Sequence, residues 1–225
     1  MSDRKPLGIL MLDTRFPRIV GDIGNAASFD FPVIFRRMEG IRSADAVTSH
    51  PDRPRVLAAL KANAEALAAE GAIGLSTSCG FLALYQNDLA AVSPVPVATS
   101  ALLLIEQMKE KRVGVITASA RNLTPAHFRA VGAPEDTPFV GLPEDSSFAE
   151  TFIRNAPTLD RDQVEREAVA AGRDLVARHP GIDTVVLECT NLPPYKKALQ
   201  AALGLPVFDV LDLLADFYAG LNARR

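Results

Sequence analysis

An internal repeat relates two parts of this 225-residue chain. Shifting the sequence by 110 residues places the segment that begins at Gly71 on the segment that begins at Gly181, without a gap. The shift superposes the only two cysteines, Cys79 and Cys189, and also the identical pairs Gly71/Gly181, Leu82/Leu192, Tyr85/Tyr195, Leu89/Leu199, Pro96/Pro206 and Val97/Val207. A repeat of this size predicts two similar lobes. If the lobes face each other, one thiol from each reaches opposite faces of one small molecule.

Aliphatic stretches alternate with longer helical patterns in both parts of the chain. We expect strands at residues 7–12, 32–37, 72–77, 95–98, 112–117, 138–141, 184–188 and near Val207. We expect helices at residues 54–70, 80–89, 100–109, 124–131, 161–178, 193–203 and 210–221. This alternation predicts an α/β fold with parallel sheets, in which ligands bind beyond the carboxyl ends of the strands. Both cysteines lie at such ends. The polar, proline-containing segment 142–160 is expected to be a loop with short helical pieces, which serves either as a lid or as an ordinary surface connection.

Composition argues against several classes of protein. The net charge is −3 and no basic stripe is present, so nucleic acid is not an expected partner. No apolar run approaches the roughly 18 residues of a membrane span, and Leu7–Leu12 is too short for a signal peptide. We therefore expect a cytoplasmic protein with reduced cysteines. The three histidines lack metal-ligand spacing and no phosphate-binding glycine motif is present, so no metal and no cofactor are expected.

The position of each cysteine suggests reactivity. A thiol at the first turn of a helix faces unpaired backbone N–H groups, which favour the thiolate and lower the thiol pKa. The same N–H groups attract a substrate carboxylate. Alternatively, each cysteine is a small buried packing residue, which is common for this residue type. The matched placement of Cys79 and Cys189 favours the chemical interpretation.

Four segments resemble the cofactor-independent aspartate/glutamate racemase superfamily, which includes hydantoin racemases. They are LGILMLDT at 7–14, STSCGF at 76–81, RVGVITASARNLTP at 112–125 and LECTNLPPY at 187–195. The resemblance spans essentially the whole chain. It implies two pseudo-symmetric α/β lobes, each a parallel sheet flanked by helices, with the active site in the cleft between them. It also implies a Cys79/Cys189 acid–base pair, no pyridoxal phosphate, no metal and a homodimer.

The resemblance suggests further substrate contacts. Asp13 matches an acidic residue that contacts the substrate amine or supports proton transfer, and a loop-capping role is the alternative. Thr14 and Thr190 are candidates for binding the substrate carboxylate, and Thr190 is also a candidate helix cap. In the second lobe, the loop that corresponds to Asp13 contributes Thr117, Ser119 and Asn122.

The chain also departs from amino-acid racemases, which often carry Asn-Thr after the first cysteine. Here Gly80 and Phe81 follow Cys79, which leaves backbone donors and the preceding Ser78. Asn191 stands where glutamate racemases often have histidine. Arg15 and Arg18 follow Asp13, and we take Arg15 as the candidate for a distal substrate carboxylate, with a solvated loop arginine as the alternative. Strand alternation predicts that Glu188 points away from the thiols.

These observations predict a first lobe of residues 1–98 and 209–225 and a second lobe of residues 99–208. The leading hypothesis is a racemase or epimerase of an amino acid or close derivative, such as aspartate or glutamate, with a small carboxylate as substrate. One alternative is a decarboxylase or isomerase of a small diacid on the same scaffold. Another is a non-catalytic ligand-binding protein.

Overall fold

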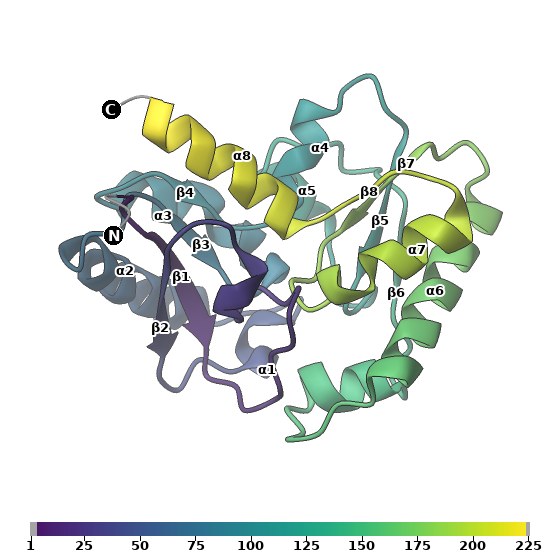
Figure 1. Ribbon diagram of the computed structural model, residues 1–225, viewed down its shortest axis with the longest axis horizontal. Helices are drawn as coiled ribbons and strands as arrows, with labels where there is room; N and C mark the ends of the chain where they lie inside the picture. The colour runs from purple at the N-terminus through teal and green to yellow at the C-terminus, as the bar shows by residue number, and fades with distance from the viewer. Residues whose placement is uncertain (1–3, 224–225) are drawn as a thin grey trace.

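The computed structural model describes residues 4–223 and contains two four-stranded parallel sheets (Figure 1). The strands are β1 Leu7–Leu12, β2 Val33–Met38, β3 Leu75–Thr77, β4 Val97–Ala98, β5 Val113–Thr117, β6 Phe139–Gly141, β7 Thr184–Leu187 and β8 Val207–Phe208. Their orders are β2-β1-β3-β4 and β6-β5-β7-β8, with every neighbouring pair parallel. The two orders are equivalent, so the sequence repeat is also a repeat of topology. The α/β fold with two similar parallel sheets is confirmed.

Helices flank both sheets in corresponding positions. The α-helices are α1 Ser43–Ala46, α2 Arg53–Ala69, α3 Gln86–Val92, α4 Leu103–Gln107, α5 Pro125–Ala130, α6 Arg161–Arg178, α7 Lys196–Leu203 and α8 Val210–Ala223. Helix α2 packs on β1 and β2, and α6 packs on β5 and β6. In Figure 1 these two long helices lie toward opposite sides of the molecule. The loops that follow the strands therefore occupy the region between the two sheets.

The central strands are apolar because both faces of each sheet are covered. All five residues of β5 and all four of β7 are buried. Such runs are typical of parallel sheets, whose strands do not alternate between core and solvent. The strands therefore fix the positions of the residues that follow them, and these include both cysteines.

Local signals set the ends of α2. The Asp52 side chain accepts a hydrogen bond from the backbone N–H of Arg55, and Pro54 occupies the first turn. The chain leaves the helix at Gly71, whose φ of +97° favours glycine. The buried residues Val56, Leu60, Ala64 and Leu67 recur at helical spacing. These features explain why this helix is predictable from sequence.

Gly8 and Gly114 show the same close packing in the two sheets. A Cβ at Gly8 would lie 2.7 Å from Leu75 Cδ2, and one at Gly114 would lie 2.4 Å from Ile182 Cδ1. Neither distance leaves room for a side chain without movement of its neighbours. The resemblance between the openings of β1 and β5 thus has a packing cause.

Several element boundaries differ from those expected. The predicted helix at 80–89 is a 3₁₀ helix, η2 Gly80–Tyr85, followed by α3, and the predicted helix at 100–109 contains only the five residues of α4. Sequence analysis missed α1, while the segment 142–160 contains a π-helix, η3 Ala149–Ile153. Helices this short depend on tertiary contacts rather than on intrinsic propensity. One such contact is the hydrogen bond from Ser43 Oγ to the carbonyl of Phe152.

The C-terminal helix α8 returns to the first sheet. The Tyr218 hydroxyl donates to the carbonyl of Lys5 at 2.8 Å, and its ring stacks on Phe31 with centroids 4.2 Å apart. Residues 1–3 and 224–225 of the predicted first lobe lie outside the described residues. The boundaries of the two lobes in the chain stay a prediction.

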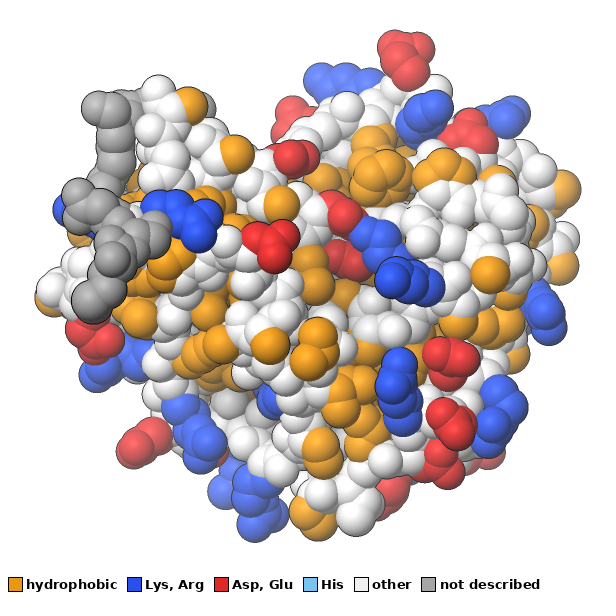
Figure 2. All heavy atoms as spheres, in the orientation of Figure 1, with side chains coloured by type: hydrophobic (Ala, Val, Ile, Leu, Met, Phe, Trp, Pro, Cys, Tyr) orange, Lys and Arg blue, Asp and Glu red, His pale blue; other side chains and the backbone are white. Residues whose placement is uncertain are grey.

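The surface gives no indication of a membrane span. Among residues 4–223, no helix has the length and apolar character needed to cross a bilayer. On the face in Figure 2, Lys and Arg side chains are interspersed with Asp and Glu rather than gathered in one patch.

Candidate functional site

The two cysteines occupy equivalent turns at the carboxyl ends of β3 and β7. The backbone N–H of Leu82 donates to the carbonyl of Cys79, and that of Leu192 donates to the carbonyl of Cys189, both at 3.1 Å. Cys79 is the N-cap residue of η2. Three residues separate Cys189 from the start of η4 Pro193–Tyr195. The repeat therefore delivers the two thiols in the same local geometry.

Both thiols line one small cavity between the two sheets. Its volume is about 20 Å³, enough for about one water molecule. The lining residues are Leu12, Phe16, Arg18, Ser43, Val47, Ser78, Cys79, Gly80, Phe81, Ala118, Phe152, Ile153, Glu188, Cys189, Thr190 and Asn191. Each cysteine is only 8% exposed. The site is thus closed, and binding of even a small carboxylate requires some lining elements to move.

Part of the 142–160 segment closes this cavity. The Phe152 ring contacts the edge of Phe16, with ring centroids 4.9 Å apart. The backbone N–H of Arg15 donates to Asn155 Oδ1 at 2.7 Å, and Ser43 Oγ donates to the carbonyl of Phe152 at 2.9 Å. The segment therefore lies where a lid would lie. Its opening stays a prediction.

The closed cavity keeps both thiols neutral. Burial and, to a smaller extent, the charge of Glu188 raise the pKa of Cys79 to about 12, although the N–H groups of Phe81 and Leu82 oppose both effects. Burial also raises the pKa of Cys189 well above its ordinary value, with a further increase from Glu188. The sequence-based expectation of lowered thiol pKa values is therefore wrong for the closed state. The helical N–H groups are present, but the loss of hydration outweighs them.

The surroundings make Cys79 the more easily ionised of the two thiols. The positive charge of Arg18 lowers the pKa of Cys79, whereas the negative charge of Asp22 raises that of Cys189. The Cys189 thiol donates to Asn191 Oδ1 at 3.6 Å, which holds its proton in place. The arrangement suits Cys79 to the role of base and Cys189 to the role of acid.

A polar chain connects Arg18 to Cys189. Arg18 Nη1 donates to Asp22 Oδ1 at 2.9 Å, and Asn191 Nδ2 donates to Asp22 Oδ2 at 2.7 Å. Asn191 in turn accepts the Cys189 thiol. Among the described lining residues, Arg18 carries the one positive charge. Its guanidinium also lies 4.3 Å from the centre of the Phe16 ring.

Ser78 and Thr190 join the two cysteine loops to each other. Thr190 Oγ1 donates to the carbonyl of Ser78 at 2.7 Å, and Ser78 Oγ accepts the backbone N–H of Leu12 at 2.9 Å. Both residues line the cavity, together with Gly80 and Asn191, and their contact with substrate stays a prediction. Their hydroxyl groups are engaged with the backbone in the closed state, so these residues hold the loops in register.

The first-lobe residues Asp13, Thr14 and Arg15 lie outside the cysteine cavity, contrary to expectation. The Asp13 carboxylate accepts the backbone N–H of Gly40 at 3.1 Å, which matches the capping alternative. Thr14 Oγ1 accepts from Arg18 Nη2 at 3.0 Å. The chain turns after β1 so that the exposed Arg15 faces neighbouring cavities, and Arg18 enters the cysteine cavity in its place.

The three second-lobe candidates, Thr117, Ser119 and Asn122, also do not line the cysteine cavity. Asn122 Nδ2 donates to Ser119 Oγ and to the carbonyl of Val47, both at 3.1 Å, so these two residues bridge the lobes. Thr117 Oγ1 donates to Glu188 Oε2 at 2.7 Å. Thr117 is therefore connected to the cysteine cavity through Glu188, although none of the three residues lines it.

Glu188 is the main site residue that sequence analysis missed. Alternation placed its side chain away from the thiols, but β7 ends at Leu187 and the backbone turns at the next residue. Glu188 is fully buried and lines the cavity with both cysteines. Burial raises its pKa to about 7, partly opposed by the Thr117 hydroxyl and the N–H of Ala118. The signal in the sequence that could have identified Glu188 is the position of a charged residue directly after an apolar strand.

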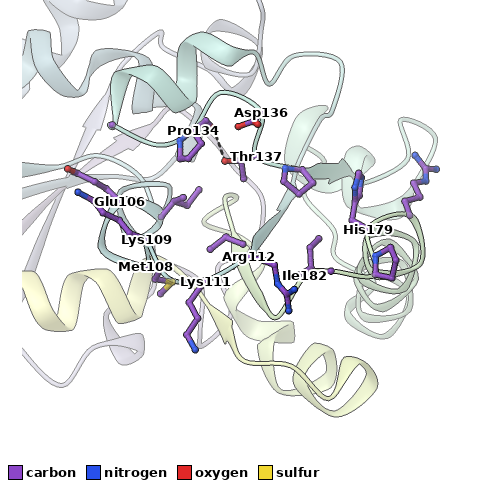
Figure 3. A pocket seen from close by; sticks show the side chains of 17 residues that line it. Glu106, Met108, Lys109, Lys111, Arg112, Pro134, Asp136, Thr137, His179 and Ile182 are labelled. Atoms are coloured by element: carbon purple, nitrogen blue, oxygen red, sulfur yellow. Dashed lines mark hydrogen bonds between the residues drawn. The ribbon is translucent and has the colours of Figure 1, made fainter.

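A larger cavity lies at the opposite end of the second sheet. It measures about 760 Å³ and is lined by residues before β5, including Lys111 and Arg112, and before β7, including His179 and Ile182 (Figure 3). Neither cysteine lines it. Among residues 4–223, no group of three or more His, Cys, Asp or Glu side chains has a metal-binding arrangement.

Dimethylsulfoniopropionate lyases are among the proteins similar to this chain in sequence. A dimethylsulfoniopropionate lyase of Durusdinium sp. clade D is 28% identical over 94% of this chain and 73% of its own length. Dimethylsulfoniopropionate lyase 3 of Emiliania huxleyi (strain CCMP1516) is 28% identical over 98% of this chain. The chain spans only 61% of the length of that second relative.

Solved structures share the fold. Allantoin racemase from Klebsiella pneumoniae superposes with a TM-score of 0.64 at 14% identity, over 96% of this chain and 88% of its own. Arylmalonate decarboxylase superposes with a TM-score of 0.62 at 17% identity, over 95% and 92%. The model of the family described as Asp/Glu/Hydantoin racemase matches residues 39–217, most of the chain including both cysteines. The chain therefore belongs to the Asp/Glu/Hydantoin racemase family.

Proposed function

We propose that this protein is an enzyme that removes the proton from a carbon next to a carboxylate, with Cys79 and Cys189 as base and acid. The observation that carries the proposal is the presence of both thiols, at equivalent turns of a repeat, in one closed cavity. A thiolate on one side takes the proton, and the carbanion is stabilised by delocalisation into the carboxylate. General acid–base groups of this kind contribute about 10²–10⁴-fold each to a rate.

The electrostatics of the cavity favour a substrate that carries a positive charge beside its carboxylate. In the closed site burial and the charge of Glu188 keep Cys79 protonated. A cationic group of the substrate next to the sulfur stabilises the thiolate and lowers its pKa. Phe16, Phe81 and Phe152 line the same cavity, and aromatic rings attract cations that have lost their hydration. An ammonium acid and a sulfonium acid both meet these requirements.

Racemisation is the first candidate reaction, and the two equivalent thiols support it. Cys79 takes the α-proton, and Cys189 delivers its own proton to the opposite face of the planar carbanion. The reverse reaction exchanges their roles. Aspartate and glutamate are the acids to test, together with hydantoins such as allantoin, in which a ring carbonyl takes the place of the carboxylate. Decarboxylation of a malonate is a related reaction. It also leaves a carbanion next to a carboxylate, and one of the two thiols then donates its proton to that carbon.

Cleavage of dimethylsulfoniopropionate is the second candidate, and the sequence relatives favour it. The Cys79 thiolate removes the α-proton, a carbon–carbon double bond forms, and the β-carbon–sulfur bond breaks with its electron pair moving to sulfur. The products are dimethyl sulfide, acrylate and the proton held by Cys79. This reaction needs only one base, and the less easily ionised Cys189 is then dispensable.

Removal of the α-proton is the step that racemisation and the lyase reaction share. Deuterium uptake from heavy water at the α-carbon tests this step. Wild type should label at least one compound among aspartate, glutamate, allantoin and dimethylsulfoniopropionate, or form dimethyl sulfide from the last. Cys79→Ser should lose at least about 100-fold in either reaction. Cys189→Ser should lose as much in racemisation but keep most of a lyase activity. Full activity in both single variants would rule out the thiol mechanism.

A further inference from the structure

Glu188 has an arrangement that a packing role does not explain. Its Oε2 accepts the Thr117 hydroxyl at 2.7 Å, whereas among residues 4–223 its Oε1 has no hydrogen-bond partner. The whole side chain is buried and belongs to the wall of the cysteine cavity. A buried carboxyl oxygen without a partner is costly, and such groups in folded proteins call for a functional explanation.

The free oxygen lies beside Gly80, next to Cys79 in the chain. A Cβ at position 80 would lie 2.2 Å from Oε1 and 2.1 Å from the main-chain oxygen of Glu188. Gly80 therefore makes the room that the carboxyl group fills. Gly80 and Phe81 have no polar side-chain atoms, so Glu188 supplies the side-chain polarity on this part of the wall.

The hydrogen bonding of the carboxyl group determines where its proton resides. Oε2 already accepts from Thr117, which leaves Oε1 to carry the proton when the group is neutral. The neutral form is favoured because the group is fully buried, and the pKa of Glu188 is raised to about 7. An O–H group on Oε1 then lies beside Gly80 in the wall of the cavity, without an acceptor among the described residues.

We propose that Glu188 is a third catalytic residue of this site, whose neutral carboxyl donates a hydrogen bond from Oε1 to the substrate carboxylate as that group takes up the charge of the departing α-proton. This inference rests on the proposed function and adds the residue that stabilises the carbanion. Donors aimed at developing negative charge act strongly in a site without water. The donor is lost when Glu188 ionises.

Ionised Glu188 has a second effect on the same step. Its negative charge raises the pKa of both Cys79 and Cys189. The other charged groups around the thiols are Arg18, which favours the Cys79 thiolate, and Asp22, which disfavours that of Cys189. Arg18 and Asp22 are paired with each other. The pKa of Glu188 is raised to about 7, so its charge changes near neutral pH.

The rate of α-proton exchange as a function of pH tests the role of Glu188. Wild type should lose kcat above about pH 7, because both effects of ionisation oppose the reaction. Glu188→Gln keeps an N–H donor and cannot ionise, so this decline should disappear. Thr117→Val removes a hydrogen bond that lowers the pKa of Glu188, so the decline should move to higher pH. A residue with only a packing role would produce neither change.

A variant without a hydrogen-bond donor at position 188 measures how much Glu188 contributes to kcat. Glu188→Leu should lower kcat by about 100-fold or more at pH 6, with little change in KM. Glu110→Gln, at an exposed position remote from the cavity, is the matched control and should behave as wild type. Wild-type kcat in Glu188→Leu, or an unchanged decline in Glu188→Gln, would overturn the role of Glu188 and leave the proposed function standing. Absence of exchange in wild type with every acid tested would overturn both.

Discussion

Replacing Gly80 with alanine tests the packing of the two cysteine loops. The new methyl group would lie 2.1 Å from the carbonyl oxygen of Glu188 and 2.2 Å from Oε1. The carboxyl group can rotate, but the carbonyl belongs to a backbone held by the hydrogen bond from the N–H of Glu188 to the carbonyl of Ile116. Overpacking of this kind costs about 1–3 kcal/mol, and a clash with backbone places Gly80→Ala at the upper end, at about 3 kcal/mol.

Gly220→Ala is the matched control for this substitution. Gly220 lies in α8, where a Cβ meets nothing within 4 Å. Alanine is favoured over glycine in a helix by about 0.5–1 kcal/mol, so this variant should be slightly more stable than wild type. Urea denaturation at 25 °C measures both changes as shifts in midpoint at constant slope. Wild-type stability in Gly80→Ala would refute the close approach of the two loops.

Three further outcomes follow from the electrostatics and the hydrogen bonds of the site. In the ligand-free protein at pH 8, iodoacetamide should modify Cys79 about 1,000-fold more slowly than a free cysteine, because the Cys79 pKa is raised to about 12; alkylation at the free rate, measured by mass spectrometry, would contradict the closed site. The pKa of Glu188 is raised from 4.5 to about 7 on folding, so the folded state favours its neutral form and loses stability as pH rises from about 4.5 to 7. Glu188→Gln lacks that loss, and its stability relative to wild type should increase by about 3 kcal/mol across this range; a constant difference in urea midpoints would contradict the buried carboxyl. Arg18→Met should raise KM for a carboxylate substrate by about tenfold or more, while Arg15→Met should not; equal effects would contradict the placement of Arg18 in the cavity.

The fold was predictable because its determinants are local or repeated. The apolar runs of β1, β5 and β7 and the capped helix α2 follow simple patterns, and the repeat indicates that the second sheet copies the first. Helix α1 was not predicted, and for η3 only a short helical piece somewhere in 142–160 was expected, because both depend on contacts between the lobes such as that of Ser43 with Phe152.

The cysteine pair and its adjacent residues were predictable for the same reason, since Ser78, Gly80, Thr190 and Asn191 follow the strands directly. The loop after β1 was harder. Its direction depends on the bond from Arg15 to Asn155, a residue 140 positions away, and this bond sends Arg18 rather than Arg15 into the cavity. Glu188 was missed because strand periodicity was extended one residue past the end of β7.

Chemical bridging of the two thiols tests the shared cavity most directly. The native protein is treated with a short reagent that carries two thiol-reactive carbons, such as 1,3-dichloroacetone, until both thiols have reacted despite their raised pKa values, and is then digested and analysed by mass spectrometry. The shared cavity predicts one bridge per chain, joining the peptide that contains Cys79 to the peptide that contains Cys189, and no exchange activity in the bridged protein. Two separately modified cysteines, with no linked peptide, would contradict a site built from both.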